Sequence, residues 1–141
     1  MSEYAPDSVA ARLAFVVGRF NRRLTPASGG LSHGLLTALA SVAKRGPLRL
    51  AELAQLETVS APGTTRIVAE LETRGLVARA VDPEDGRAVL IQVTPAGTAA
   101  ILRARAARAE VIAELLAGLS PDELAGIEAA LPALEKILEQ Y

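Results

Sequence analysis

The sequence predicts a mainly α-helical chain that carries one small β-hairpin. Apolar residues recur every three or four positions through most of the 141 residues, which is the period of an amphipathic helix. Two short valine-containing runs, residues 77–81 and 88–93, flank the turn-forming segment 82–87, Asp-Pro-Glu-Asp-Gly-Arg. Two strands joined by such a segment form a hairpin.

Length and composition indicate an ordinary globular protein. Half of the 141 residues are apolar, which is enough for one domain with a substantial core. The absence of cysteine excludes disulfides, thiolate metal sites and a cysteine redox switch within the chain. No apolar run approaches the roughly 20 residues of a membrane span, and the N-terminus lacks the pattern of a signal peptide. We therefore expect a cytoplasmic protein with no membrane partner.

The charge is unevenly distributed, although the net charge is only −1. Residues 44–108 contain ten basic and seven acidic side chains, whereas residues 109–141 contain one basic and seven acidic side chains. A mildly basic body with an acidic tail permits DNA binding at one end of the molecule. The alternative is a solvated acidic helix that has no bearing on a partner.

Two helices are predicted before residue 50. Asp7-Ser8 is a helix N-cap, followed by an apolar stripe of Val9, Leu13, Val16, Phe20 and Leu24. Residues 25–30 form a loop by composition. Ser32 caps the next helix, whose buried face is Leu35, Leu36, Leu39 and Val42. Gly46-Pro47 ends that helix, and Leu48-Arg49 could add a short third strand beside the hairpin.

Residues 50–75 predict a pair of helices joined by a tight turn. The first helix covers residues 50–56, residues 57–59 connect, and the second helix covers residues 61–74 with Gly75 as its cap. The residues expected to face inward are Leu50, Leu53, Ala54, Leu56, Val59, Ile67, Val68 and Leu71. Helix, turn, helix and hairpin in this order form a winged helix-turn-helix, which presents its second helix to a DNA major groove.

The exposed face of that second helix supplies the candidate DNA contacts. They are Ser60, Ala61, Pro62, Gly63, Thr64, Thr65 and Arg66. Ala69 and Thr73 lie further along the same face, and Ser60 is expected to act more as the helix cap than as a contact. Proline is tolerated in the first turn of a helix because the N–H there has no intrahelical partner. The small residues on either side of it would allow close approach to a surface, and the free N–H groups suit a phosphate.

Arg74, Arg79, Arg87 and Asp85 extend this candidate site. Arg87 is expected to probe a minor groove, although it could instead pair with Asp85 and stiffen the hairpin. Arg66 is expected to contact a groove, and the alternative is a solvated side chain. Arg74 and Arg79 could touch phosphates or simply balance neighbouring glutamates.

Two more helices complete the chain. Thr94-Pro95 starts a helix that runs to Leu116 or Ala117, with Gly118 as its stop. Residues 120–123, Ser-Pro-Asp-Glu, form a capping box for the last helix. Its apolar seam consists of Leu124, Ile127, Leu131, Leu134 and Leu138. Pro132 lies inside this helix and should kink it near Glu128.

These residues resemble the MarR family of bacterial transcription regulators over nearly the whole chain. The resemblance is carried by Leu53-Ala54, Val59-Ser60, Thr65-Arg66-Ile67-Val68, Leu71-Glu72, Arg74-Gly75-Leu76-Val77 and Arg79, then by Asp85-Gly86-Arg87, Leu90, Val93-Thr94 and Gly97. It implies a single MarR-type domain over residues 1–141. Residues 32–94 would form the winged helix-turn-helix, and residues 1–31 and 95–141 a helical dimerisation region.

The resemblance also implies a homodimer whose two winged regions read an inverted repeat. The candidate dimerisation residues are Val9, Leu13, Val16, Leu124, Ile127, Leu131 and Leu134. Many relatives release DNA when a small aromatic or phenolic anion binds between the dimerisation and DNA-binding parts. Phe15, Arg19 and His33 are candidates for such a site. Helix packing and surface charge explain Phe15 and Arg19 equally well, and His33 could be only a polar residue in the first turn of its helix.

The sequence therefore predicts a sequence-specific, DNA-binding transcriptional regulator, a repressor that acts as a homodimer and responds to a small effector. An alternative is a winged-helix dimer that serves as a protein-interaction or ligand-sequestering module without tight DNA binding. No phosphate-binding glycine loop, activated nucleophile or paired catalytic carboxylates occur in the pattern, so we expect no enzyme activity. We expect no cofactor, and one histidine without cysteine predicts no metal site.

Overall fold

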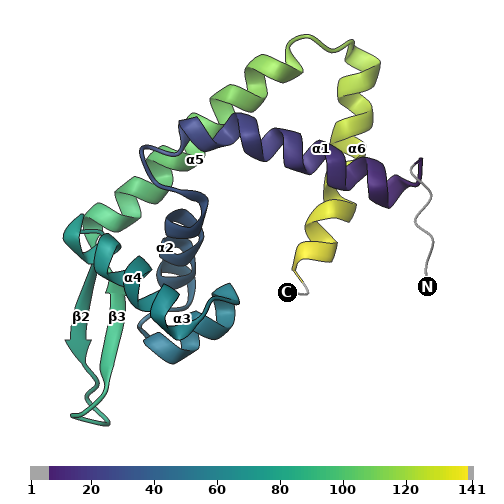
Figure 1. Cartoon of the computed structure of the whole chain (residues 1–141). Coiled ribbons are helices and arrows are strands. Elements are labelled where there is room, and N and C mark those ends of the chain that lie inside the picture. Colours follow the sequence, from purple (N-terminus) through teal and green to yellow (C-terminus); the bar gives the residue numbers. More distant parts are fainter. Residues whose placement is uncertain (1–6, 140–141) are drawn as a thin grey trace. The chain divides into compact units, whose positions relative to one another are not determined.

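The computed structural model describes residues 7–139 and confirms the predicted fold class (Figure 1). The helices in this part are α1 (Val9–Leu24), α2 (His33–Arg45), α3 (Leu50–Glu57), α4 (Ala61–Thr73), α5 (Pro95–Leu116) and α6 (Pro121–Leu138). The strands are β1 (Leu48–Arg49), β2 (Val77–Val81) and β3 (Val89–Val93), and Thr25–Ala27 form the 3₁₀ turn η1. Residues 1–6 and 140–141, the ends of the predicted dimerisation region, lie outside the described residues.

The contacts divide the chain into two compact units. One unit ends at Arg108 and the other begins at Ala109, so the helix α5 passes through the boundary. The first unit holds α1 to α4, the sheet and the larger part of α5. The second unit holds the end of α5 and the whole of α6.

Serine side chains start four of the helices, as the sequence predicts. Ser8, Ser32, Ser60 and Ser120 each accept a hydrogen bond on Oγ from the backbone amide three residues later, at 3.1, 3.3, 3.2 and 3.2 Å. Each bond satisfies an amide that the first turn of a helix leaves without an intrahelical partner. These starts were predictable because a cap depends only on residues three apart.

The sheet has the strand order β1-β3-β2, with antiparallel pairing throughout. Leu48 of β1 pairs with Ile91 of β3, and Val77 of β2 pairs with Val93. This confirms the predicted third strand. Since β3 is the central strand, its Ile91 side chain is completely buried.

The core lies between the sheet and the helices α2, α3 and α4. The largest fully buried side chains include Leu39, Leu53, Leu71 and Val68, one or more from each of these helices. The helix α5 adds Ile101 and Ala104. In Figure 1 the β2–β3 hairpin projects from this helical body as a wing. The core thus fixes α4 and the base of the wing in one unit.

The first turn of α5 is held against the turn that follows α4. The Thr94 hydroxyl donates to the Gly75 carbonyl at 2.6 Å, and the Thr94 amide donates to the Leu76 carbonyl at 3.1 Å. A Cβ on Gly97 would overlap the Leu76 carbonyl oxygen and would lie 2.8 Å from Cγ2 of Val93. Only glycine therefore allows this close approach, which joins α5 to the end of α4.

Three predicted boundaries are wrong by one residue. The helix α3 runs one residue further, to Glu57, α4 ends at Thr73, and β3 begins at Val89. The predicted loop begins with the 3₁₀ turn η1, in which Pro26 occupies an early position that needs no N–H donor. Helix ends are the least determined part of a periodic pattern.

The prediction that Leu56 faces inward is also wrong, because 39% of its surface is exposed. Its neighbour Leu53, one turn earlier, is fully buried. The helix ends after Glu57 at Thr58, which has a left-handed backbone with φ of 53°. The end of the apolar stripe is therefore not covered.

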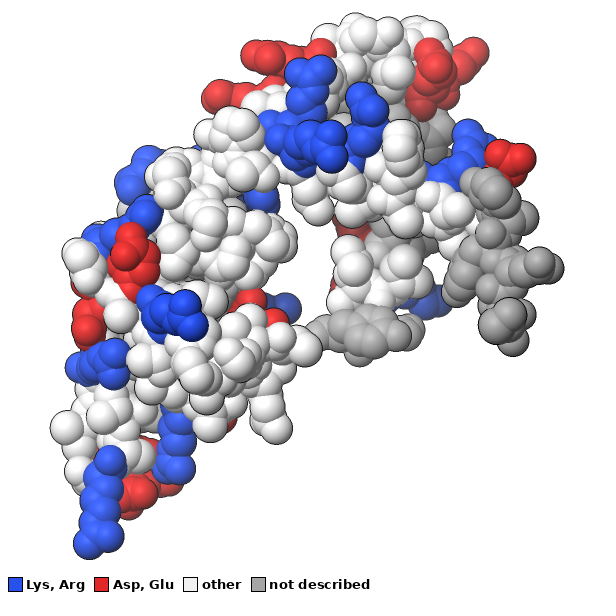
Figure 2. All heavy atoms as spheres, viewed as in Figure 1, with Lys and Arg blue, Asp and Glu red and all other residues white. Residues whose placement is uncertain are grey.

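The second unit is acidic and leaves much of its apolar seam exposed. The predicted capping box is present, since Ser120 Oγ accepts from the Glu123 amide and the Glu123 carboxylate accepts from the Ser120 amide at 3.0 Å. The Ser120 amide also holds the pKa of Glu123 below its ordinary value. The helix α6 continues through Pro132. Acidic side chains gather around the end of α5 and the start of α6, at the top of Figure 2.

Within residues 7–139, none of the helices combines the length and the apolar character that crossing a lipid bilayer requires.

Candidate nucleic-acid interface

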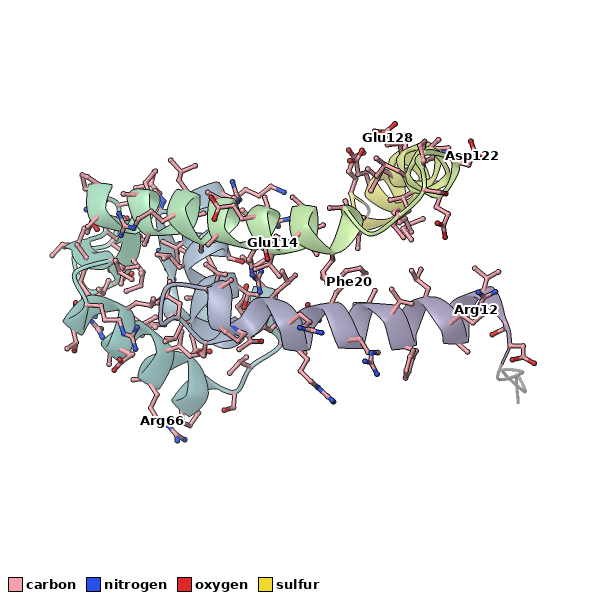
Figure 3. The ribbon with its side chains drawn as sticks, turned by 90° about the horizontal axis from the view of Figure 1, so that it is seen from above. Arg12, Phe20, Arg66, Glu114, Asp122 and Glu128 are labelled. Carbon is pink, nitrogen blue, oxygen red and sulfur yellow. The ribbon has the colours of Figure 1, made fainter. Side chains whose placement is uncertain are left out.

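The N-terminal half of α4 forms the exposed surface that the sequence predicts. Ser60, Ala61, Pro62, Thr65 and Arg66 are exposed. Figure 3 shows Arg66 projecting from α4 away from the rest of the first unit. The face therefore presents small side chains close to the backbone and one long cationic side chain beyond them.

Gly63 is only partly exposed, and its small size has a structural reason. A Cβ on Gly63 would lie 2.8 Å from Cγ1 of Val59 and 3.1 Å from Oγ of Ser60. Val59 thus fills the turn below the helix end, as predicted. The absence of a side chain on Gly63 therefore leaves room for Val59 and the Ser60 cap, and it also keeps the helix surface flat.

Thr64 corrects one predicted contact. It is 2% exposed, and its hydroxyl donates to the Ser60 carbonyl at 3.0 Å. A position that follows Gly63 by one residue rotates by about 100° around the helix, which turns Thr64 toward the core. Thr64 is therefore a core residue, and its side chain is not available for a DNA contact.

Hydrogen bonds within the helix end restrict what this face can donate. The Gly63 amide donates to Ser60 Oγ, the Thr64 amide donates to the Ser60 carbonyl, and Pro62 has no N–H. This leaves the amide of Ala61 as the backbone donor at this end. The Thr65 hydroxyl donates to the Ala61 carbonyl at 3.0 Å, so its oxygen can only accept from a partner.

Arg74 and Arg79 both pair with neighbouring glutamates, the second of the two roles that the sequence left open, and their contact with phosphates stays a prediction. Arg74 donates to Glu70 at 2.8 Å and to the Gly30 carbonyl at 3.0 Å. Arg79 donates to Glu72 at 3.1 Å. Arg74 therefore connects the C-terminal end of α4 to the loop before α2. Arg66 lies nearer the N-terminal end of the same helix.

The wing tip is made of charged residues held by a local turn. Asp85 accepts on Oδ1 from the Arg87 amide at 3.0 Å. The Arg87 guanidinium is not part of any of the three ion pairs found in residues 7–139. Basic and acidic side chains stand together at the tip of the wing, at the lower left of Figure 2. Asp85 thus shapes the turn that carries Arg87, and the Arg87 side chain is exposed.

An ion pair at the base of the wing is not predicted by the sequence pattern. Arg49 Nη2 lies 2.8 Å from Oδ2 of Asp82, and only 8% of the Asp82 surface is exposed. The hydrogen bond from Arg49 lowers the pKa of Asp82, with a further contribution from the Glu84 amide. The two residues are 33 positions apart, so spacing along the chain contains no signal for this pair.

The three predicted effector residues lie on two helices, Phe15 and Arg19 on α1 and His33 on α2. The Arg19 guanidinium carbon lies 5.7 Å from the Phe15 ring centroid, on an exposed part of α1. His33 is exposed in the first turn of α2. A cavity of about 210 Å³ lies elsewhere in the first unit and is lined by Ser28, Gly29, Leu31, Arg74, Leu76, Ala100 and Arg103.

The predicted dimerisation residues are largely exposed in the single chain. On α1 the exposed fractions of Val9, Leu13 and Val16 are 82%, 36% and 43%. On α6 those of Ile127 and Leu131 are 39% and 44%, and Leu124 and Leu134 are half-buried. Exposed apolar side chains at helical spacing are typical of a surface that packs against another helix.

Comparison with known proteins identifies the sequence relatives of the chain. The protein-family model for the MarR family matches residues 31–89. An uncharacterized HTH-type transcriptional regulator of Mycobacterium bovis is 38% identical over 117 residues, which is 82% of this chain and 82% of that protein.

Solved structures of regulators share the fold. A mutant of MarR from E. coli has a TM-score of 0.78 at 24% identity, covering 93% of this chain and 96% of that one. A mutant of Staphylococcus aureus MepR bound to an oligodeoxyribonucleotide has a TM-score of 0.70 at 17% identity, covering 93% and 98%. A Mycobacterium tuberculosis MarR family protein in complex with p-aminosalicylic acid has a TM-score of 0.70 at 23% identity, covering 91% and 98%.

Proposed function

Since the chain belongs to the MarR family of helix-turn-helix transcriptional regulators, which bind DNA and are not enzymes, we propose that it is a homodimeric repressor of an inverted-repeat operator. In this proposal each α4 enters a major groove and each wing lies along the adjacent minor groove. A cytoplasmic location follows from the proposal, because bacterial DNA lies in the cytoplasm.

The observation that carries the proposal is the exposed start of α4. Ala61 and Pro62 bring the helix end close to a surface without long side chains, while Arg66 projects outward. The Ala61 amide at the positive end of the helix suits a phosphate oxygen. This combination of a flat helix end and one long cation fits a groove floor flanked by phosphates.

The side chains on this face favour particular bases. The Thr65 methyl group and the apolar surface of Pro62 suit the methyl group of thymine, whereas Arg66 suits the two acceptors of guanine. The Thr65 oxygen accepts, so it fits an amino group of adenine or cytosine. We expect few direct base contacts and a large contribution from phosphates, which makes binding sensitive to salt.

The exposed apolar positions of α1 and α6 support the homodimer. An inverted repeat with half-sites about one helical turn apart requires a two-fold symmetric protein. Burial of Val9, Val16 and Leu131 against a second copy would remove apolar surface from water.

The cavity beside Arg74 is a candidate effector site. Arg74 and Arg103 provide cations and Leu31, Leu76 and Ala100 an apolar wall, which suits a small aromatic carboxylate. A carboxylate that takes a hydrogen bond from Arg74 would compete with Glu70 and the Gly30 carbonyl, which hold the end of α4. Binding there would thus shift α4, and a relative of the same fold has been solved with p-aminosalicylic acid.

Calorimetry with salicylate tests the effector site separately from DNA binding. Heat of binding at millimolar ligand is expected for the wild type, and Arg103→Ala should weaken binding because it removes one of the two cations. Arg105→Ala, a neighbouring arginine outside the cavity lining, is the matched control. No heat for the wild type would contradict this part of the proposal and leave DNA binding untouched.

Two arginine variants test the proposed DNA contacts. Arg66→Ala and Arg87→Ala should each weaken binding to a duplex from the gene's own upstream region by roughly 1–3 kcal/mol. Arg45→Ala removes the same charge from the last turn of α2 and should change the affinity much less. Equal affinities for all these proteins would favour the alternative that the acidic wing motivates, an interaction module without tight DNA binding.

A further inference from the structure

An ion pair connects the base of the wing to the start of the helix-turn-helix, in addition to the backbone pairing of β1 with β3. Arg49 belongs to β1 and is the residue that precedes α3. Asp82 follows the last residue of β2, where the wing loop begins. The strand order β1-β3-β2 places β3 between them, so the Arg49 side chain reaches across the central strand.

Asp82 uses both carboxylate oxygens, and each has a different task. Oδ2 accepts from Arg49 at 2.8 Å, and Oδ1 accepts from the Glu84 amide at 2.9 Å. The Asp82 amide also donates to the Ala88 carbonyl at 3.0 Å, which closes the loop. The carboxylate therefore fixes the first turn of the wing loop and anchors that turn to β1.

The backbone of Arg49 is itself held in place. The Arg49 amide donates to the Glu52 carboxylate at 3.1 Å in the first turn of α3. The Arg49 backbone pairs with Leu90 of β3. The backbone of Arg49 is therefore held by both a strand and a helix. Its guanidinium can support the wing loop because the backbone that carries it is fixed.

We propose that Arg49 and Asp82 are positioning residues for DNA recognition, because their ion pair holds the wing loop, and with it Arg87, at a set position relative to α4. Neither side chain needs to touch DNA for this purpose. The effect on the wing follows from the geometry alone, whereas the effect on DNA rests on the proposed contact of Arg87 in the minor groove.

Hydrogen exchange in the free protein tests the positioning directly. Arg49→Ala and Asp82→Asn should speed exchange of the amides in residues 82–88 severalfold, while exchange within α4 stays as in the wild type. Arg45→Ala, which removes an arginine outside the ion pair, should leave the wing unchanged. Unchanged wing exchange in both ion-pair variants would overturn the proposal, whether or not the protein binds the chosen DNA.

Whether Asp82→Asn binds DNA more weakly or more tightly than the wild type distinguishes a positioning role of the ion pair from a direct contact of Arg49 with DNA. Asp82→Asn removes a negative charge near DNA and frees Arg49, so simple electrostatics and a direct Arg49–phosphate contact both predict equal or tighter binding. The positioning role predicts the opposite, about tenfold weaker binding, comparable to the loss of one good contact. Glu84→Gln removes the same charge from the same loop, and its side chain takes no part in the ion pair.

Anisotropy titrations with a duplex from the gene's own upstream region would measure these affinities. Weaker binding of Asp82→Asn together with equal or tighter binding of Glu84→Gln supports the proposal. The double variant Arg49→Ala/Asp82→Asn should bind like either single variant, because both changes remove one interaction. Tighter binding of Asp82→Asn, or additive losses in the double variant, would contradict it.

Discussion

Single residues decide how closely the parts of the first unit approach, and Gly97 is the clearest example. Its backbone lies against the Leu76 carbonyl, which cannot move without shifting the start of β2. Gly97→Ala should therefore lower the free energy of unfolding by about 1–3 kcal/mol in a urea titration. Gly34→Ala is the matched control, because the space beside Gly34 in α2 is open. Equal stability of the two variants would contradict the close approach.

Asp82 also gives the stability of the protein a dependence on acid pH. Because Arg49 lowers the pKa of Asp82 in the folded protein, the ion pair contributes fully above the ordinary aspartate pKa of about 4. The contribution is lost as the pH falls through the lower, folded value. Glu84, Asp85 and Glu52 are the other acidic groups around the pair.

The stability of Asp82→Asn should accordingly fall less than that of the wild type between pH 7 and pH 3. Urea midpoints measured across this range test the prediction. The variant retains the acid-sensitive capping carboxylate Glu123, whose pKa is also lowered, so some decline remains. Parallel pH curves for the two proteins would show that Asp82 contributes nothing.

At the scale of the element, the start of α4 combines a helix cap with a surface proposed to face phosphate. Ser60→Ala removes the hydrogen bond to the Gly63 amide and should cost about 1 kcal/mol of stability. Ser60→Asp keeps a capping oxygen and adds a negative charge, so it should keep the stability but weaken DNA binding. Urea titration and anisotropy measure the two effects. If Ser60→Asp bound DNA as tightly as the wild type, a DNA phosphate could not lie beside this end of α4.

Elements with local causes were predictable from the sequence, and contacts between distant elements were not. The serine caps and the capping box depend on residues three apart, so Ser60 and Ser120 were placed correctly. Periodicity shows which face of a helix is apolar, but it does not show how far neighbouring elements cover that face. Leu56 is therefore more exposed, and Thr64 more buried, than the pattern predicts.

The candidate DNA-binding face could be predicted because its residues are consecutive in one helix. The ion pair between Arg49 and Asp82 could not, because it depends on β3 lying between β1 and β2. The same holds for Arg74, whose bond to the Gly30 carbonyl joins residues 44 positions apart. Pairings of this kind become visible only when the strand order and the loop path are known.

At the largest scale, the proposed recognition of an inverted repeat requires two copies of the chain. Leu131→Glu places a charge in the exposed seam of α6 and should convert the dimer to a monomer, because burial of an unpaired charge is unfavourable. Leu56→Glu is a close control, since the exposed fractions are 44% for Leu131 and 39% for Leu56. Sedimentation velocity distinguishes the two species. A wild-type monomer at micromolar concentration, or a dimeric Leu131→Glu, would contradict the proposed interface.

Recognition of a specific DNA site by this chain can be tested by one titration. Fluorescence anisotropy with a duplex from the gene's own upstream region, repeated at several salt concentrations and with excess random competitor, is the measurement. We expect tight binding that weakens steeply with salt and survives the competitor. Equally weak binding to this duplex and to random DNA would contradict the claim for this site.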